Sequence, residues 1–369
     1  GCIIVPDVLE TLQQLAKIYR RQFTIPILGI TGSNGKTTTK EMVHRVLASH
    51  YSCGVTQGNL NNHIGVPLTL LGLEPDLDIA VVEMGANHQG EIAELCRIAS
   101  PTHGLITNIG KAHLEGFGGI SGVIKGKGEL YDFLKNNEGV VFVNRDENHL
   151  EQMSAGFRRK IMYGSCQELP RSLYQVRLLA TQPFLKLAFS DEQGELWTVQ
   201  THLTGEYNLA NLMTAICVGQ YFKVPEEKIA TAIASYIPAN NRSQILIQGS
   251  NKFLLDAYNA NPSSMRKALE SFASLPAEEK NKVAVIGDML ELGEYSAEEH
   301  RDMAHFALQA HFDQLILVGP AFEAVAKQEG IRHFDSTDKL KAWLSENPFE
   351  NCFVLLKASR GIGLECILE

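Results

Sequence analysis

The feature that most constrains the fold is the stretch at residues 29–40, GITGSNGKTTTK, which follows the apolar run TIPIL. An apolar strand, a glycine-containing turn and a Lys-Thr pair at a helix start surround a phosphate with backbone N–H groups. The stretch therefore predicts an α/β fold that binds a nucleotide. Lys36 is expected to reach the outer phosphate oxygens and Thr37 to contact Mg²⁺. The other residues of this predicted phosphate loop are Gly32, Ser33, Asn34, Gly35 and Thr38.

The spacing of this loop departs from the general pattern G-x-x-x-x-G-K-[ST], which needs a glycine where the chain has Ile30. The spacing here is Gly32-x-x-Gly35-Lys36-Thr37. A glycine-rich turn before an ordinary surface helix is the alternative, but it requires the strand, the glycines, the lysine and the threonine to coincide by chance.

Apolar strands alternate with helical patterns along most of the chain, which predicts mostly parallel sheets covered by helices. We predict a helical linker region at residues 1–24, a central ATP-binding domain at 25–242 and a C-terminal Rossmann-like α/β domain at 243–369, joined near Asn240 to Ser243. An antiparallel extension is expected between Tyr174 and Leu203, turning at DEQGE. The linker region contains a predicted amphipathic helix, residues 8–23, whose apolar residues at helical spacing are Leu12, Leu15, Ile18 and Tyr19.

Composition excludes several classes of protein. The 369 residues exceed one ordinary domain, and no apolar run approaches the roughly 20 residues needed to span a bilayer. The first residues lack the charged, apolar and small-residue order of a signal peptide, so a cytoplasmic enzyme without membrane insertion is expected. The net charge of −9, with no basic cluster, argues against a nucleic-acid partner. The seven cysteines are scattered, which favours reduced thiols over disulfides or zinc sites.

Two polar residues follow predicted strands, where ligands of parallel sheets collect. Glu83 ends the apolar segment DIAVVE and can complete the coordination of the Mg²⁺ that Thr37 contacts. His113 lies in the glycine-rich segment TNIGKAHLEGFGG and is a candidate metal ligand. A solvated glutamate and a surface histidine are the ordinary alternatives.

Together with six further segments, the phosphate loop and the segments of Glu83 and His113 resemble the Mur ligase family, the ATP-dependent amide-forming enzymes of peptidoglycan precursor synthesis. The segments that carry the resemblance occur in family order: TGSNGKTTTKEM, GNLNNHIGVPLTLL, VVEMGANHQGEI, TNIGKAHLEGFGG, KGKGEL, GEYNLANLMTA, DAYNANPSSM, GDMLELGEYSAEEH and KASRG. They are most similar to the members that add D-alanyl-D-alanine to a UDP-N-acetylmuramoyl tripeptide. The resemblance implies small-molecule substrates, and we expect a monomer.

The resemblance also implies a chemistry. ATP would phosphorylate a peptide carboxylate to an acyl phosphate, which an amine then attacks, with two Mg²⁺ ions and fixed cations offsetting the negative charge. Thr37 and Glu83 would hold one ion, and His113 and Lys127 the other. Lys127 would carry a carbamate formed with CO₂, because an ammonium cannot bind a cation. Taken alone, Lys127 could equally be a surface lysine paired with Glu129 or Glu115.

Further roles follow from the resemblance, and each has a structural alternative such as a helix cap, a turn before Pro262 or a solvated basic loop. Arg242 would act in catalysis with Lys36, His113 and Lys127, by reaching the γ-phosphate when the domains close. The expected nucleotide contacts are Asn208 and Asn211 on the adenine side and Asp256 near the ribose or phosphates. The expected substrate contacts are Asn59, Asn61 and Asn62 for the muramoyl peptide, Tyr258, Asn259 and Asn261 for the dipeptide or nucleotide, and Lys357, Ser359 and Arg360 for the dipeptide carboxylate.

One departure from the family concerns the start of the chain. Family members carry an N-terminal domain that binds the uridine diphosphate end of the substrate, and Gly1 to Asp7 cannot form it. We therefore expect intact ATP and metal binding with weakened binding of the nucleotide-sugar substrate.

Three other functions stay open at this point. A folylpolyglutamate-synthetase-like ligase shares the phosphate loop and the carbamate chemistry. A P-loop ATPase or switch without acyl transfer needs neither Lys127 nor a second metal site. A catalytically idle interaction protein would not need Thr37, Glu83, His113 and Lys127 together.

Overall fold

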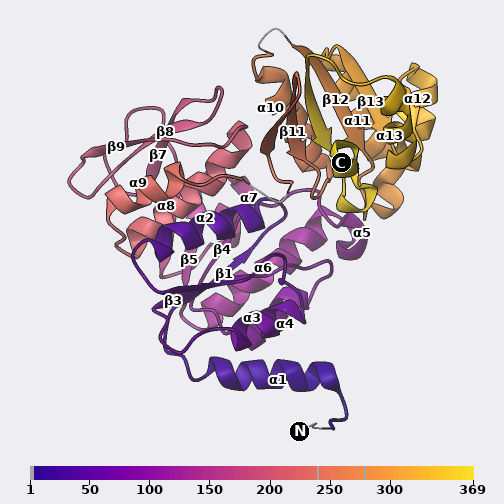
Figure 1. The fold of residues 1–369 in the computed structure, drawn as a ribbon. Coiled ribbons are helices and arrows are strands. Elements are labelled where there is room, and N and C mark those ends of the chain that lie inside the picture. The colour runs from indigo at the N-terminus through magenta and orange to yellow at the C-terminus, as the bar shows by residue number, and fades with distance from the viewer. Residues whose placement is uncertain (1–3, 239–240, 278–279) are drawn as a thin grey trace.

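The structure, a computed structural model, describes residues 4–238, 241–277 and 280–369 and contains two sheets flanked by helices (Figure 1). We call the part built on the first sheet the N-terminal lobe, α1 to α9, and the part built on the second sheet the C-terminal lobe, β10 to the end. Figure 1 shows α1 at the end of the N-terminal lobe that lies away from the C-terminal lobe. Residue Asn240 of the predicted junction lies outside the described residues.

The sheet of the N-terminal lobe has nine strands in the order β2-β3-β1-β4-β5-β6-β7-β8-β9. The strands from β2 to β7 pair in parallel, whereas β7, β8 and β9 pair antiparallel, which confirms the predicted extension and its turn. The bounds are β1 Ile27–Thr31, β2 Cys53–Val55, β3 Ile79–Glu83, β4 His103–Ile106, β5 Val140–Asn144, β6 Lys160–Ser165, β7 Gln175–Ala180, β8 Lys186–Ser190 and β9 Leu196–Gln200.

Helices cover both faces of this sheet because its central strands are apolar on both sides. Ile27 faces the side covered by α3, α4 and α6, and Leu28 and Ile30 face the side covered by α2, α8 and α9. The helices are α1 Val8–Arg20, α2 Lys36–Ala48, α3 Gly65–Leu71, α4 Glu91–Ala99, α5 Leu114–Phe117, α6 Ile120–Asn136, α7 Asn148–Met153, α8 Leu209–Tyr221 and α9 Glu226–Ala234, with the short 3₁₀ turn η1 Glu206–Asn208.

The sheet of the C-terminal lobe has the order β10-β11-β15-β12-β13-β14, antiparallel at β10/β11 and parallel elsewhere, as expected for a Rossmann-like unit. Its strands are β10 Gln244–Gln248, β11 Asn251–Asp256, β12 Asn281–Gly287, β13 Gln314–Val318, β14 Arg332–Phe334 and β15 Cys352–Lys357. Its helices are α10 Pro262–Ser274, α11 Ser296–Gln309, α12 Glu323–Glu329 and α13 Thr337–Glu346, and its 3₁₀ turns are η2 Gly293–Tyr295, η3 Pro320–Phe322, η4 Arg360–Ile362 and η5 Leu364–Leu368.

The prediction for the first helix was wrong in two respects. Helix α1 ends at Arg20 rather than Phe23, and Leu15 and Ile18 are more than half exposed. The buried residues are Ala16 and Arg20, whose guanidinium donates to the carbonyls of Ala99, Ser100 and Phe23. Helix α1 packs on α3 and α4 through this side. Arg20, hydrogen-bonded to three carbonyls, therefore anchors the helix, whereas the hydrophobic spacing indicated Leu15 and Ile18.

Two expectations from composition can be compared with the described residues. No helix among them is both long enough and apolar enough to cross a membrane. The six cysteines that the structure describes are all free thiols, in line with the expected absence of disulfides in this part of the chain.

Phe272 provides a test of the C-terminal core. Its fully buried ring on α10 lies 5.4 Å from the ring of Phe312 and 4.9 Å from that of Phe353. We expect Phe272→Ala to lower the free energy of unfolding of the C-terminal lobe by about 3–5 kcal/mol. The fluorescence of Trp343 on α13 reports on this lobe in guanidinium unfolding, and Trp197 on β9 reports on the other.

The matched control is Leu308→Ala on α11, because that side chain is 39% exposed. The control should change the free energy of unfolding by less than about 0.5 kcal/mol. Equal losses in the two variants would contradict the assignment of Phe272 to the core.

Candidate active site

The predicted phosphate loop lies between β1 and α2, and two of its glycines have conformations that exclude a side chain. Gly32 has φ 141°, and a Cβ there would lie 2.0 Å from Thr107 Oγ1. Gly35, with φ 78°, caps α2, and a Cβ there would lie 2.5 Å from Asn211 Oδ1. The loop is thus held against the end of β4 and the start of α8, with the N-terminus of α2 opening beyond it.

Three predicted site residues meet at the first turn of α2. The Thr37 hydroxyl donates to Glu83 Oε1 at 3.2 Å, and Glu83 is the last residue of the neighbouring strand β3. Lys36 Nζ donates to the carbonyls of Gly32 and Ser33. Burial lowers the pKa of Lys36, the charge of Glu83 opposes this shift, and the charge of Arg242 adds to it.

Two further residues contact Glu83, and the sequence did not indicate that they lie together with it. Asn61, predicted as a substrate contact, donates to Glu83 Oε1 at 2.8 Å. Lys40, which was not predicted, lies with its Nζ 3.7 Å from Glu83 Oε2 and donates to the carbonyl of Gly58. Glu83 Oε2 itself accepts no hydrogen bond among the described residues, although Glu83 is almost completely buried. A carboxylate oxygen left without a donor in this position suits a cation.

Lys127 lies on α6 and is completely buried, whereas Lys125 on the same helix is exposed. Its Nζ donates to the carbonyl of Ala86 at 3.0 Å and lies 4.9 Å from the centre of the Phe117 ring. An ammonium has three protons to donate, so a single acceptor leaves it poorly satisfied. Burial lowers the pKa of Lys127 well below its ordinary value, and the charge of Lys36 lowers it further.

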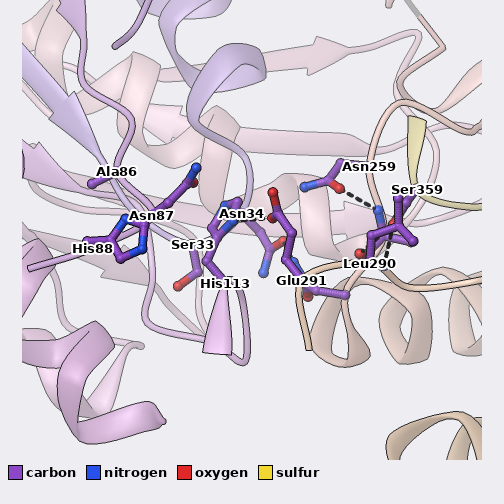
Figure 2. Close-up of polar contacts among 12 residues, drawn as sticks. Ser33, Asn34, Ala86, Asn87, His88, His113, Asn259, Leu290, Glu291 and Ser359 are labelled. Carbon is purple, nitrogen blue, oxygen red and sulfur yellow. Dashed lines mark hydrogen bonds and ion pairs between the residues drawn. The ribbon is translucent and has the colours of Figure 1, made fainter. Parts of the chain in front are cut away.

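His113 precedes the short helix α5 and contacts the C-terminal lobe. Its Nδ1 contacts Glu291 Oε2, and this hydrogen bond lowers the pKa of Glu291. Figure 2 shows Glu291 reaching from the C-terminal lobe toward the region of Ser33, Asn34 and His113. Phe117 connects His113 with Lys127 in the structure. Helix α5 begins at the residue after His113 and ends at Phe117, whose ring contacts Lys127.

Other polar contacts join the lobes around the phosphate loop. Asn261, which caps α10, donates from Nδ2 to Asn34 Oδ1 at 2.7 Å. Lys111 forms an ion pair with Glu299, and its backbone N–H donates to Ser263 Oγ. The C-terminal lobe therefore contacts the phosphate loop directly.

Arg242 lies where the chain passes between the lobes. Its guanidinium carbon is 3.7 Å from the centre of the Tyr258 ring, and that of Arg360 is 5.4 Å from the same ring. Its Nε is buried without a hydrogen-bond partner in the described part of the chain. Its charge lowers the pKa of both Lys36 and Lys40, which indicates that Arg242 lies near the phosphate loop.

Several other predicted site residues are engaged within the protein. Asp256 pairs with Lys357 at 2.8 Å, and Lys357 also donates to the carbonyl of Asn259. The remaining residues of this kind use their polar atoms locally: Asn208 on Thr204, Asn211 on Thr39 and Asn208, Asn62 on the first turn of α3, Asn259 on Ala260, and Ser359 on Leu290 and Ala260. Asn59 is exposed and offers its side chain to solvent.

The donor set fits Mg²⁺ held jointly by protein and phosphate. Among the described residues, no group of three or more His, Cys, Asp or Glu side chains could hold a metal ion by itself. Mg²⁺ is usually bound by one or two carboxylates together with substrate phosphates, and Thr37 with Glu83 provides such a partial site beside the phosphate loop. Lys127 also fits a carbamate, since the neutral amine that burial favours is the form that reacts with CO₂.

Known proteins similar to this chain cover nearly all of it. The family described as Mur ligase middle domain matches residues 30–219, and that described as Mur ligase, glutamate ligase domain, matches residues 241–360. The UDP-N-acetylmuramoyl-tripeptide–D-alanyl-D-alanine ligase of Bacillus subtilis is 33% identical over 382 residues, which include 100% of this chain and 80% of the relative.

Two solved structures have the same fold over 99% of this chain. MurF from Acinetobacter baumannii has a TM-score of 0.86 and 28% identity, with 81% of its chain covered. MurF ligase from Thermotoga maritima, solved in complex with ADP, has a TM-score of 0.83 and 26% identity, with 84% of its chain covered.

The buried amine of Lys127 predicts a pH-dependent stability. Between the lowered pKa of the folded state and the ordinary value of 10.5, the unfolded chain binds more protons, so wild-type stability rises with pH. Lys127→Met keeps the aliphatic length and removes this dependence. We expect the variant to be more stable than the wild type at low pH, with a difference that shrinks as the pH approaches 10.5.

Guanidinium unfolding over a pH series in CO₂-free buffer measures this difference. Lys125→Met is the matched control for removing a lysine charge from an exposed position of α6. A stability difference for Lys127→Met that is constant with pH would contradict a buried neutral amine.

Proposed function

This chain belongs to the Mur ligase family, and from this premise we infer that it adds D-alanyl-D-alanine to a UDP-N-acetylmuramoyl tripeptide while it converts ATP to ADP and phosphate. The observation that carries the inference is the buried Lys127 beside the phosphate loop. A nucleotide switch without acyl transfer has no use for a buried amine at that position. The relatives with this named activity match the chain along its whole length.

The proposed reaction has two steps. A carboxylate oxygen of the tripeptide attacks the γ-phosphorus of ATP, the bond to the β-phosphate oxygen breaks, and ADP leaves. The amine of the dipeptide then attacks the acyl carbon, loses a proton, and phosphate departs with the bonding electron pair. Both steps concentrate negative charge, so the role of the protein is electrostatic stabilisation and positioning.

Lys36 and Arg242 are the residues that we assign to the phosphates. Lys36 is at the N-terminus of α2, where the helix dipole and the backbone N–H groups also favour an anion. Arg242 has a buried Nε without a partner in the described structure and exerts its charge on Lys36. A γ-phosphate between them would offset the repulsion between the two cations.

We propose that Thr37 and Glu83 hold one Mg²⁺ and that His113 and carbamylated Lys127 hold the second. When bound, the two ions neutralise the charge that develops on the transferred phosphoryl group. Asn61 and Lys40 also contact the Glu83 carboxylate and help to keep it in place. The carbamate would also place an anion close to Lys36, whose positive charge lowers the pKa of the unmodified Lys127 amine.

We assign substrate contacts to predicted site residues whose side chains are exposed. Arg360 is exposed and is the cation that we assign to the dipeptide carboxylate, because Lys357 is neutralised by Asp256. The ring of Tyr258 contacts the guanidinium groups of both Arg242 and Arg360. Asn59 is the candidate for contact with the muramoyl peptide.

The roles of the other polar residues are positional in this proposal. Asn208, Asn211 and Asn261 hold the phosphate loop against α8 and α10. The two sheets support a division into domains at residues 25–242 and 243–369. We further propose a cytoplasmic monomer, because the reaction uses ATP and the named site lies within one chain.

The reaction predicts a strict dependence on both substrates. With ATP, Mg²⁺, UDP-muramoyl tripeptide and D-alanyl-D-alanine present, the protein should release phosphate, and omission of any one component should abolish the release. The reason is that the acyl phosphate forms only on a bound carboxylate and is consumed only by an amine. A coupled phosphate assay measures the release.

Two outcomes of the same assay would contradict this function. Phosphate release that is stimulated by folate and glutamate instead would identify a folylpolyglutamate-synthetase-like ligase. Release from ATP alone, unaffected by either peptide substrate, would identify an ATPase or switch.

Loss of the amine of Lys127 should remove turnover without removing nucleotide binding. We expect Lys127→Ala to lower the rate of phosphate release on the order of 10²-fold or more, as for loss of a metal ligand. A small carboxylate such as acetate should restore part of the rate by replacing the carbamate, and Lys125→Ala should behave as the wild type. Full turnover of Lys127→Ala in CO₂-free buffer would contradict the carbamate.

A further inference from the structure

The loop after β12 reaches across the lobe interface with the side chain of Glu291, which contacts His113. Glu291 has φ 62° and His113 has φ 52°, so both residues that meet across the interface have left-handed backbones. For residues other than glycine this conformation costs roughly 1 kcal/mol or more and persists only where surrounding contacts hold it. Both backbones are therefore held in an unusual conformation that brings the two side chains together.

The contacts that hold Glu291 come from both lobes. Its carbonyl accepts a hydrogen bond from Glu115 N at 3.4 Å, in the N-terminal lobe. On the other side, the N–H of Leu290 donates to Ser359 Oγ at 2.9 Å, and the N–H of Met289 donates to the buried ring of His300 at 3.0 Å. The loop is thus fixed on the C-terminal lobe by two hydrogen bonds just before Glu291.

The contact between Glu291 and His113 bears on which nitrogen of the imidazole carries the proton. Glu291 Oε2 lies at His113 Nδ1, and a carboxylate there accepts the proton of that nitrogen. A neutral imidazole with its proton on Nδ1 has its lone pair on Nε2. Nδ1 of His113 is a buried atom whose described contact is with the Glu291 carboxylate, and the side chain of His113 is 18% exposed. A histidine that binds a metal through one nitrogen commonly donates from the other to a carboxylate, which fixes the tautomer and the ring orientation.

We propose that Glu291 is a positioning residue for the second metal site: it holds His113 in the Nδ1–H tautomer with Nε2 directed toward the cation. This inference rests on the proposed function, in which His113 is a metal ligand. Because Glu291 belongs to the C-terminal lobe and His113 to the N-terminal lobe, the metal site becomes complete only when the lobes are together. Cation binding and lobe association therefore stabilise each other.

The strongest competing role for Glu291 is a direct contact with the dipeptide. A carboxylate in this interface could bind the ammonium group of the incoming substrate instead of acting through His113. Glu291 lies next to Leu290, which is hydrogen-bonded to the residue before Arg360. The two roles predict different responses to the same substitutions.

The first measurement uses the metal-free protein and no substrate. Nitrogen-15 NMR of labelled histidine reports which nitrogen of His113 carries the proton, and His113→Gln assigns the signal. We expect the Nδ1–H tautomer in the wild type and a mixture of tautomers in Glu291→Ala. Glu291→Gln should retain much of the wild-type tautomer, because the amide oxygen can still accept the hydrogen bond. An unchanged tautomer in Glu291→Ala would overturn the proposal, whatever reaction the protein catalyses.

The second measurement is Mn²⁺ binding in the presence of ADP, followed by electron paramagnetic resonance of the free ion. Glu291→Ala should weaken one Mn²⁺ site about 10- to 100-fold and leave the other unchanged, with Glu291→Gln in between. Glu294→Gln is the matched control, because Glu294 is an exposed glutamate of the same loop. Unchanged Mn²⁺ affinity together with a raised KM for the dipeptide, equal in both Glu291 variants, would assign Glu291 to the ammonium group and overturn the positioning role.

Discussion

The concentration of positive charge around Glu83 is the constraint on which the rest of the site depends. Lys40 is buried and Lys36 is partly buried near this one carboxylate, and the charge of Arg242 lowers the pKa of each. The pKa of Lys127 is lowered by burial and further by the charge of Lys36. Such an arrangement is unfavourable by itself and becomes favourable when polyphosphate supplies the missing negative charge. The fold therefore maintains a repulsion between cations that bound nucleotide would offset.

The sheet topology explains how residues distant in sequence reach this point. Strands β1, β3 and β4 are adjacent and parallel, so their carboxyl ends deliver the phosphate loop, Glu83 and the segment before His113 to one edge. The C-terminal lobe presents the carboxyl ends of β11, β12 and β15, which carry Asp256, the loop of Glu291, and Ser359 with Arg360. Each lobe thus contributes one half of the interface.

The parts of the fold and site that could be predicted are those encoded locally. The glycines at 32 and 35, the Lys-Thr pair and the alternation of apolar strands with helices each depend on neighbouring residues, and the structure has them where expected. Strands β2, β6, β10 and β14 were not predicted, because their residues are mostly part-buried or exposed and lack the continuous buried apolar run of β1 and β3. Helical spacing also could not show that Arg20, rather than Leu15 and Ile18, makes the buried contact, since the partner lies on α4.

The contacts that define the candidate site most sharply were beyond sequence reasoning for the same reason. Asn61 with Glu83, Asn34 with Asn261, and His113 with Glu291 all join residues that the chain separates by at least 22 positions. The asparagines of GNLNNHIG and the glutamate of GDMLELG were visible as polar residues in unusual loops, but their partners depend on tertiary structure. Lys127 is the intermediate case: its position in a motif indicated a role, and only its complete burial explains why the amine can be neutral.

The ring of Tyr258 has a mechanical consequence for the passage between the lobes. Both guanidinium groups near it are held by the face of an aromatic ring, whose attraction for a cation is broad and only weakly dependent on direction. A hydrogen-bonded carboxylate would lock Arg242 in one orientation and would cancel its charge. On the ring, Arg242 keeps its full charge and is not fixed in one orientation by a directional bond, which suits a cation that lies where the chain passes between the lobes.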